Sequence, residues 1–292
     1  MKPAPFDYLV PETLTAVLAA LTQHGDEAKL LAGGQSLIPA MNFRLARPGV
    51  LVDINRLEGE LAYIKATANG GLRLGALTRH YQVERSPLVA QHDPLLQQMM
   101  PHIAHPQIRN RGTLGGSLAH ADPAAELPVW AIARQATLTI QSERGSRQVA
   151  ASDFFTGLFA TDLAADEMVT EVAVEPLPPR SGTGFVEMAR RHGDYALAGV
   201  AAIVTLAADG RCAAARLVCL NVGEVPQVAE RAAATVVGQR PTADLFAAAA
   251  DIAAREEIDP TDDIHASAAY KRHLVRVLTQ RALVQAFEAV KN

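Results

Sequence analysis

Two glycine-rich segments hold the residues best suited to bind a ligand. The first is Ala32-Gly33-Gly34-Gln35-Ser36-Leu37, and the second is Thr113-Leu114-Gly115-Gly116-Ser117-Leu118. Glycine adopts positive φ and lets a ligand approach the backbone with no Cβ in the way. Several N–H groups beside a small hydroxyl form a donor surface for an anion. We therefore predict that the segments form two sides of one anion site, and a dinucleotide pyrophosphate is the ligand that suits it best.

The spacing of these glycines excludes the two best-known nucleotide motifs. Neither segment matches G-x-G-x-x-G at the start of a helix, and neither matches G-x-x-x-x-G-K followed by Ser or Thr. A nucleotide bound here therefore requires a different fold. A single Gly-Gly pair is also common in ordinary turns, so the prediction depends on the presence of both segments.

The cysteines limit the redox chemistry of this chain. Only Cys212 and Cys219 are present, whereas an iron–sulfur cluster normally takes four cysteines. On a predicted strand, side chains seven positions apart point to opposite faces, and we interpret both thiols as packing residues. A disulfide stays open, although two cysteines in a chain of this length favour an intracellular thiol protein.

Three histidines surround the second glycine segment, namely His102, His105 and His120. Their spacing fits no metal site, and no other group of His, Cys, Asp and Glu has metal-ligand spacing. We therefore predict no metal site and expect these histidines to be structural or exposed.

The composition is typical of a soluble protein with two or three lobes. Of the 292 residues, 49% are hydrophobic, which is enough to bury a sizeable core. The net charge is −4, and the scattered basic residues form no cluster of the kind that binds nucleic acid. No N-terminal signal region and no membrane-length apolar run are evident, so we expect a cytoplasmic protein.

The elements that position the glycine segments mix helices and strands. Leu14, Val17, Leu18 and Leu21 predict one helical face that ends at Gly25. The pattern also predicts strands over residues 29–31, 50–54, 61–67, 72–77, 137–141 and 168–174, with a hairpin turn at 69–71. It predicts helices over 78–83 and 88–100, and a further helix to about Arg134 that begins at Asp122-Pro123.

A proline-rich segment, residues 176–182, marks the clearest boundary in the chain. Beyond it we predict a strand over 184–188 and a hairpin that pairs 199–207 with 212–222 around Asp209-Gly210. Three helices near 225–237, 242–255 and 266–290 complete the chain. The predicted organisation is a domain over 1–176, with lobes of about 1–57 and 58–176, and a second domain over 177–292.

Three stretches together resemble one protein family. They are 31–45, which contains the first glycine segment, Asp53-Ile54-Asn55, and 108–123, which contains the second. The chain resembles the FAD-binding medium subunit of the molybdenum hydroxylases, a family that includes flavoprotein subunits of carbon monoxide dehydrogenase, bacterial xanthine dehydrogenase and N-heterocycle dehydrogenases. The resemblance spans nearly the whole chain, and Gly193-Asp194-Tyr195 falls in the expected order.

The resemblance implies the fold and the site. It implies the FAD-binding fold shared with vanillyl-alcohol oxidase, in which two α+β lobes hold FAD and a C-terminal α+β domain covers the flavin side. Residues 32–37 and 113–117 then contact the pyrophosphate, and Ser117, where many members have Asn, can still donate a hydrogen bond.

Other site residues follow from the same resemblance. Asp122 matches an acidic position near the adenosine and ribityl part of FAD, or it is only a helix N-cap. Tyr195 matches an aromatic beside the isoalloxazine, or it is a half-buried core tyrosine. Leu163 falls where the family places backbone against the flavin ring. Arg109 and Arg111 face the phosphates, or they are surface charges or contacts to a partner.

The resemblance implies a relay function with no catalytic residue on this chain. A small partner subunit carries two [2Fe-2S] clusters, a large one carries molybdopterin, and FAD passes electrons from the clusters to an external acceptor, in a complex expected to be a heterohexamer. Two alternatives stay open: a self-sufficient flavin oxidase or reductase of the same fold, and a non-catalytic nucleotide-binding assembly module. The fold does not identify the substrate or the acceptor.

Overall fold

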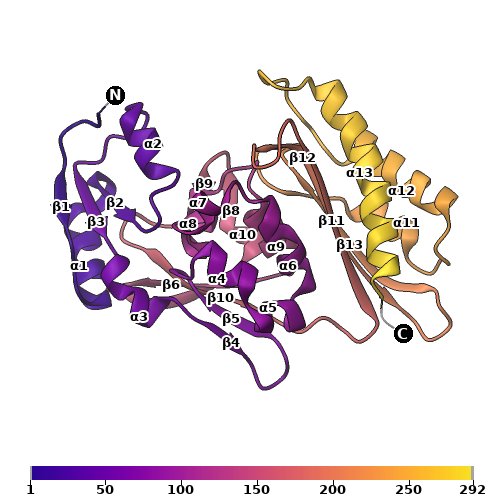
Figure 1. The fold of residues 1–292 in the computed structure, drawn as a ribbon, viewed down its shortest axis with the longest axis horizontal. Coiled ribbons are helices and arrows are strands. Elements are labelled where there is room, and N and C mark those ends of the chain that lie inside the picture. Colours follow the sequence, from indigo (N-terminus) through magenta and orange to yellow (C-terminus); the bar gives the residue numbers. More distant parts are fainter. Residues whose placement is uncertain (1, 291–292) are drawn as a thin grey trace.

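Three sheets of three or more strands follow one another along the chain and divide it into three units (Figure 1). The computed structural model describes residues 2–290. In Figure 1 the first unit lies on the left, the second in the middle and the third on the right. The mixture of helices and sheets confirms the predicted α+β class.

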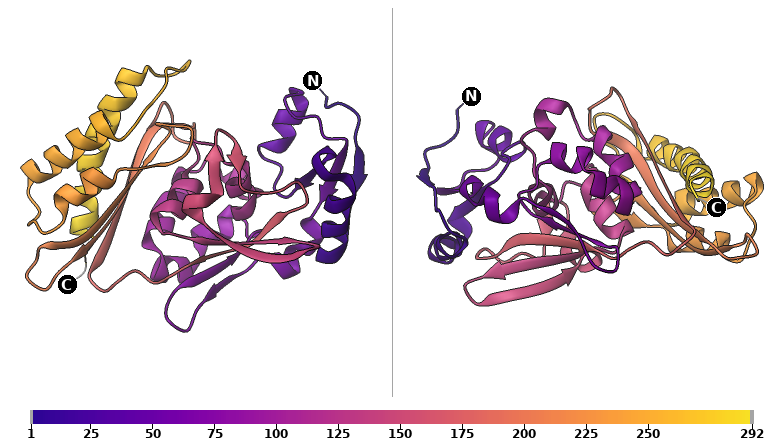
Figure 2. Two further views of the ribbon diagram at one scale, coloured as in Figure 1. Left: turned by 180° about the vertical axis from the view of Figure 1, so that it is seen from behind. Right: turned by 60° about the horizontal axis from the view of Figure 1, so that its bottom comes forward.

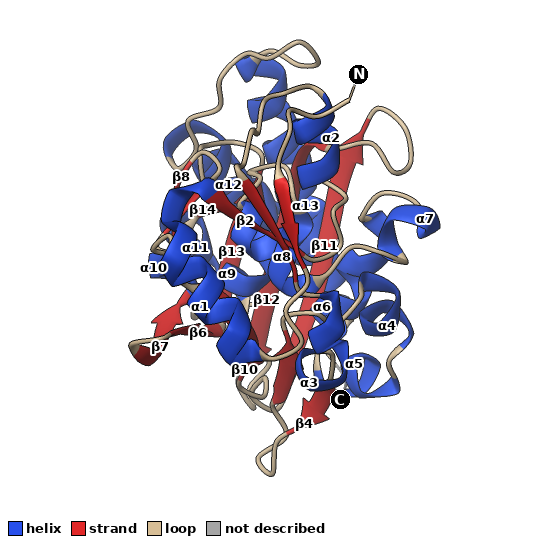
Figure 3. Cartoon of the chain, turned by 90° about the vertical axis from the view of Figure 1, so that its left-hand side faces the viewer, coloured by secondary structure: helices blue, strands red, loops and turns tan. Residues whose placement is uncertain are grey.

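A short parallel sheet of order β1-β3-β2 organises the small lobe. Its elements are β1 (Asp7–Leu9), α1 (Leu14–His24), the 3-10 turn η1 (Gly25–Glu27), β2 (Ala28–Leu31), α2 (Leu37–Asn42) and β3 (Val50–Asp53). Helix α1 begins where Thr13 Oγ1 accepts the Ala16 N–H at 3.2 Å, and it ends at Gly25, whose φ is +50°. Seen from the side of this lobe, α2 lies at the top and α1 below it (Figure 3).

An antiparallel sheet of order β4-β5-β10-β6-β7 organises the larger lobe. Its strands are β4 (Ile64–Ala66), β5 (Leu72–Gly75), β6 (Thr137–Ser142), β7 (Gly145–Ala150) and β10 (Met168–Val174), with a separate pair β8 (Phe155–Gly157) and β9 (Ala160–Thr161). Its helical elements are η2 (Asn55–Leu57), α3 (Glu58–Leu61), α4 (His80–Arg85), α5 (Pro87–His92), α6 (Pro94–Met99), η3 (Met100–His102), α7 (Pro106–Arg109), α8 (Leu114–His120), α9 (Glu126–Ala133) and α10 (Ala151–Phe154). The predicted hairpin at 69–71 is present, because Ala66 pairs with Leu72.

Two predicted helix boundaries between residues 78 and 100 are wrong. The single helix expected over 88–100 is two helices, because Asp93 Oδ1 accepts the Leu96 N–H at 3.1 Å and caps α6, with Pro94 at its first position. The helix expected from Thr78 starts at His80. The Thr78 hydroxyl is engaged elsewhere, since it donates to the Tyr63 carbonyl at 2.9 Å.

A buried ion pair joins the helices of the larger lobe to its sheet. Asp93 is fully buried, and its Oδ2 accepts hydrogen bonds from Trp130 Nε1 at 2.9 Å and from Arg134 Nε at 3.0 Å. The Arg134 side chain is 4% exposed, and its Nη2 also donates to the Glu175 carbonyl at 2.5 Å. One carboxylate thus ties α6, α9 and the chain after β10 together.

A four-stranded sheet of order β11-β12-β13-β14 organises the C-terminal unit. Its elements are β11 (Ser181–Ala189), β12 (Ala196–Leu206), β13 (Cys212–Leu220), β14 (Gln227–Val228), α11 (Glu230–Val236), α12 (Ala243–Glu256) and α13 (Ala268–Glu288). The last three helices cover the outer face of the sheet, and α6 and α9 contact its inner face (Figure 2). No helix within residues 2–290 is both long and apolar enough to span a membrane.

The inner face of this sheet has no core of its own. Phe185, Ile203 and Leu220 belong to the same buried cluster as Trp130 of the larger lobe. Polar contacts cross the same boundary, since Arg216 Nε donates to the Ile132 carbonyl at 3.1 Å. The proline-rich segment therefore joins two units that share one hydrophobic core.

The two cysteines lie on the same face of β13, and the expectation of opposite faces is wrong. Cys212 pairs with Leu206 whereas Ala214 pairs with Thr205, so one extra residue enters the ladder as a β-bulge. The bulge turns Cys212 toward the core beneath α11–α13, which also contains Cys219. Both thiols are free, and burial raises their pKa values, that of Cys219 to about 12.

Candidate functional site: a cavity across three units

A cavity of about 670 Å³ crosses the small lobe, the larger lobe and the start of the C-terminal unit. The predicted site residues that line it are Ala32, Gly33, Gly34, Gln35, Ser36, Leu37, Thr113, Gly115, Gly116, Ser117, Asp122, Leu163 and Tyr195. Leu114 is the exception, because it is fully buried in the core of the larger lobe. Both glycine segments therefore face one cavity, whose volume is typical of a small-molecule site.

The first glycine segment supplies backbone donors. It connects β2 to α2, Gly34 has a φ of +69°, and Gln35 Nε2 donates to the Gly33 carbonyl at 2.9 Å, which folds the segment into a turn. Within residues 2–290, the N–H groups of residues 33–37 have no protein acceptor. A run of unpaired amides on a cavity wall is a built site for an anion.

The second glycine segment differs from the expected open turn. It is the first turn of α8, where Thr113 Oγ1 accepts the Gly116 N–H at 3.2 Å as the N-cap. The Leu114 and Gly115 amides donate to the carbonyls of Thr78 and Ala76 at 3.0 and 2.8 Å. This segment therefore offers the hydroxyls of Thr113 and Ser117 and a surface without Cβ atoms, and the amide donors come mainly from the first segment.

A polar clamp holds the two segments against each other. Asn55 Nδ2 donates to the Ala32 carbonyl at 3.0 Å, and Asn55 Oδ1 accepts from Arg79 Nη2 at 2.6 Å. Arg79 Nη1 in turn donates to the Arg111 carbonyl at 2.6 Å. A Cβ on Gly33 would lie 2.4 Å from that same carbonyl oxygen, so only glycine fits at this junction.

Asp122 lines the cavity but does not cap a helix. Helix α9 begins at Glu126, four residues later than Asp122, and Asp122 Oδ1 accepts the Ala124 N–H at 2.9 Å in the preceding turn. The predicted helix start is wrong because an Asp-Pro pair also closes such Asx turns. Burial raises the pKa of this carboxyl above its usual range.

Glu126 is a cavity residue that the sequence analysis missed. It is 6% exposed and lines the cavity near Asp122. Burial and the nearby charge of Glu187 on β11 raise the pKa of Glu126 to about 8. The only local signal for Glu126 is an acid directly before the apolar run of α9. With the helix predicted to begin at Asp122, this acid resembles an ordinary glutamate in the first helical turn.

The shifted acid predicts a stability that depends on pH. The pKa of Glu126 is raised in the folded state, so the folded protein holds a proton that the unfolded chain releases above about pH 4.5. We expect the FAD-free protein to lose stability as pH rises from about 5 to 8, and Glu126→Gln to flatten this slope. Urea unfolding across this range measures it. A slope equal to that of the unmodified protein would contradict the assignment, and Glu224→Gln, outside the cavity, is the control.

Aromatic side chains border the cavity. Tyr195 is 65% exposed, so the alternative of a half-buried core tyrosine is wrong. Phe159, which the sequence analysis missed, has a φ of +53°, is 53% exposed and packs on His120 with ring centroids 5.1 Å apart. Exposed aromatic faces on a cavity wall suit a planar ring system.

The arginine beside the second segment has a structural role. Arg109 is 7% exposed, pairs with Glu84 at 2.8 Å, and donates to the carbonyls of Ile103 and Ala104 at 2.9 and 3.1 Å. It thus holds a turn that lines the cavity, and Arg109 itself is not among the lining residues. Arg111 lies at a second cavity of about 380 Å³, which borders the first glycine segment.

The histidines around the second segment are spread over different contacts. His102 Nδ1 lies 3.3 Å from Glu187 Oε1, His105 stacks on His192 with centroids 6.5 Å apart, and His120 lines the cavity. Within residues 2–290, no three His, Cys, Asp or Glu side chains are arranged to hold a metal ion. Burial also lowers the pKa of His80, another cavity residue, to about 4, which keeps that imidazole neutral at physiological pH.

The amide turn, the facing hydroxyls and the exposed aromatics define a protein that binds an elongated, phosphate-bearing cofactor between lobes. Residues 4–178 match the family model of the FAD binding domain in molybdopterin dehydrogenase, and residues 183–286 match the CO dehydrogenase flavoprotein C-terminal domain. The chain belongs to the family of FAD-binding medium subunits of molybdenum hydroxylases, and FAD is its cofactor.

Relatives and solved structures agree with this membership. The 6-hydroxypseudooxynicotine dehydrogenase complex subunit alpha of Paenarthrobacter nicotinovorans is 43% identical over 100% of this chain and 97% of its own length. Carbon monoxide dehydrogenase of Hydrogenophaga pseudoflava superposes with a TM-score of 0.95 at 35% identity, covering 100% of both chains. Quinoline 2-oxidoreductase of Pseudomonas putida 86 superposes with a TM-score of 0.93 at 40% identity, covering 99% of both chains.

Proposed function

We propose that this subunit takes electrons from [2Fe-2S] clusters of a small partner subunit and passes them through FAD to an external acceptor. A large partner subunit with molybdopterin would oxidise the substrate, and the complex would work in the cytoplasm as a heterohexamer. The observation that carries the proposal is the single cavity that joins the amide turn of residues 33–37 to the exposed ring of Tyr195. Two buried cysteines leave this chain without ligands for a cluster of its own.

The residues present fit FAD in a definite direction. The unpaired amides of residues 33–37, with the hydroxyls of Thr113 and Ser117, are suited to the pyrophosphate. The end of the cavity at Tyr195 suits the isoalloxazine, because the aromatic there is exposed. The opposite end, near Asp26 and Lys29, is then left for the adenosine.

The proposed direction of FAD changes the part of the cofactor that Leu163 is expected to contact. The family resemblance implies that the backbone of Leu163 lies against the flavin ring. The loop that contains Leu163 leads directly into Met168, whose side chain belongs to the core of the small lobe together with Leu21 and Ala28. We therefore propose that Leu163 lies toward the adenosine end of the cavity.

The chemistry of the protein itself is limited to binding and tuning. Bound FAD supplies a centre that accepts two electrons and releases them singly or in pairs. The protein would contribute the amide turn that orients the phosphates, and Glu126, whose raised pKa favours a neutral carboxyl in the cavity at neutral pH.

Flavin identity is the first test of this function. We expect the purified protein to be yellow and to retain FAD in preference to FMN, because FMN lacks the second phosphate and the adenosine that would occupy the far end of the cavity. Acid release of the flavin followed by chromatography identifies it. Failure to bind flavin after reconstitution with excess FAD would contradict the proposal.

A reductive titration separates the remaining functions. In the purified complex, the flavin absorbance should bleach when substrate reduces the large subunit, and the isolated FAD-loaded subunit should not turn over substrate alone. Turnover by the isolated subunit would instead indicate a self-sufficient oxidase or reductase. A flavin that never changes redox state during turnover of the complex would indicate an assembly module.

A further inference from the structure

The loop between β9 and β10 forms one wall of the cavity. Leu163, Ala164, Ala165 and Glu167 all line it, although residues 162–167 belong to no helix or strand. A loop without secondary structure is usually mobile unless side chains hold it in place. The position of this wall must therefore be set by contacts between the loop and side chains of neighbouring elements.

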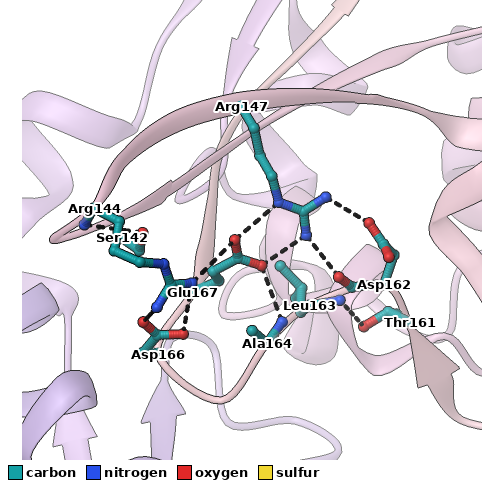
Figure 4. A network of polar contacts seen from close by, with 9 residues as sticks. All are labelled: Ser142, Arg144, Arg147, Thr161, Asp162, Leu163, Ala164, Asp166 and Glu167. Atoms are coloured by element: carbon teal, nitrogen blue, oxygen red, sulfur yellow. Dashed lines mark hydrogen bonds and ion pairs between the residues drawn. The ribbon is translucent and has the colours of Figure 1, made fainter.

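Most of the side-chain contacts to this loop come from Arg147 of β7 (Figure 4). Arg147 Nε and Nη2 donate to the two carboxylate oxygens of Glu167 at 2.8 and 2.7 Å. Arg147 Nη1 donates to Asp162 Oδ2 at 2.5 Å, and Nη2 also donates to the Asp162 carbonyl at 2.6 Å. The guanidinium thus bridges the first and last residues of the loop with its full fork of donors.

Glu167 connects Arg147 to the middle of the loop. Its side chain is only 7% exposed, and its Oε2 also accepts the Ala164 N–H at 3.0 Å. Hydrogen bonds from Arg147 hold the pKa of Glu167 below its usual range, so the carboxylate is charged at neutral pH. A second arginine, Arg144, pairs with the Asp166 carboxylate and lies 3.8 Å from Glu167 Oε1, but its side chain is 65% exposed and it does not contact Asp162 at the start of the loop.

We propose that Arg147 is a positioning residue for the cofactor, which fixes loop 162–167 over the adenosine end of the cavity. The inference rests on the proposed direction of FAD. Strand β7 is an edge strand that pairs only with β6, so its arginine is free to reach the loop from outside the sheet. The β6–β7 hairpin then acts as a brace for the nucleotide site.

The test compares Arg147→Ala with the unmodified protein, using FAD and ADP as separate probes. We expect the Kd for FAD and the Kd for ADP to rise together by about tenfold, because both ligands need the ordered loop. The visible spectrum of bound FAD should stay unchanged, since the flavin lies at the other end. Hydrogen exchange of the amides of residues 162–167 should accelerate in the FAD-free variant.

Three further variants make the result specific. Arg147→Lys keeps the positive charge without the fork of donors, and it should retain part of the affinity that Arg147→Ala loses. Glu167→Gln is the substitute test if Arg147→Ala does not fold, and it should weaken the binding of FAD and of ADP alike. Arg211→Ala removes an exposed arginine of the C-terminal unit and should change neither Kd. An Arg147→Ala protein that binds both ligands within about twofold of the unmodified protein would overturn the proposal. An Arg147→Ala protein that loses affinity for FAD but keeps its affinity for ADP would also overturn the proposal. An unmodified protein that binds no FAD would instead overturn the proposed function.

Discussion

Gly33→Val should abolish retention of FAD. A Cβ at position 33 would lie 2.4 Å from the Arg111 carbonyl oxygen and 2.9 Å from Gly112 Cα, so valine must push the two glycine segments apart. Overpacking of this kind costs about 3 kcal/mol, which corresponds to roughly a hundredfold loss of affinity. The flavin content of the purified variant and its Kd for FAD measure the effect.

The chain offers a matched control for this substitution. Gly59 lies on the exposed helix α3, and a Cβ there would meet nothing within 4 Å, so Gly59→Val should retain FAD fully. Gly115→Val is a poorer test, because its Cβ would lie 2.5 Å from Ala76 Cβ and would also disturb the packing of α8. Full FAD content in Gly33→Val would show that the junction of the two segments does not shape the site.

Asp93→Ala should destabilise the whole FAD-binding domain. The substitution leaves Arg134, which is 4% exposed, without its carboxylate partner, and it also removes the partner of Trp130 Nε1 and the cap of α6. Breaking a buried ion pair on one side typically costs about 3–5 kcal/mol. Urea unfolding of the FAD-free protein gives the free energy of unfolding directly.

A double variant distinguishes the buried charge from the lost contacts. Asp93→Ala combined with Arg134→Met should regain part of the lost stability, because no unpaired charge then remains buried. Arg276→Ala breaks an exposed pair with Asp251 and should change stability by no more than about 1 kcal/mol. If Asp93→Ala lowered the free energy of unfolding no more than Arg276→Ala does, the buried pair would not stabilise the domain as predicted.

Much of the fold follows from local sequence patterns. Apolar spacing at Leu14, Val17 and Leu21 predicted α1, and Gly25 predicted its end. The hairpin turns at 69–71 and at Asp209-Gly210 were equally predictable, since turn chemistry is local. The strand over 168–174 coincides with β10.

The errors arise where a side chain satisfies a distant or competing partner. Thr78 could have capped a helix, but its hydroxyl donates a hydrogen bond to the carbonyl oxygen of Tyr63, fifteen residues earlier in the chain. Cys212 changed faces because of a bulge that no composition signal marks. Glu126 was missed because its pKa depends on burial by elements far away in the sequence, including Glu187 on β11.

The meeting of the two glycine segments at one cavity could be predicted from the sequence, whereas the contacts that hold them together could not. The glycine segments carry their own signal, since glycine is required wherever backbones meet closely, as Gly33 meets Arg111. The clamp of Asn55 and Arg79 has no local signal, because its geometry exists only after the lobes have met. The two glycines of the second segment also did not indicate that this segment forms the first turn of helix α8.

The shared core of the larger lobe and the C-terminal sheet limits how such subunits can be recombined. Phe185, Ile203 and Leu220 pack in one cluster with Trp130, so a break in the chain at the proline-rich segment does not separate two folding units. A chimaera that joins residues 1–176 of one relative to the C-terminal domain of another would have to exchange α6 and α9 as well. We therefore expect that exchange of the C-terminal domain alone would disrupt this shared core, whereas a joint exchange of the contacting residues on both sides of the boundary would preserve its packing.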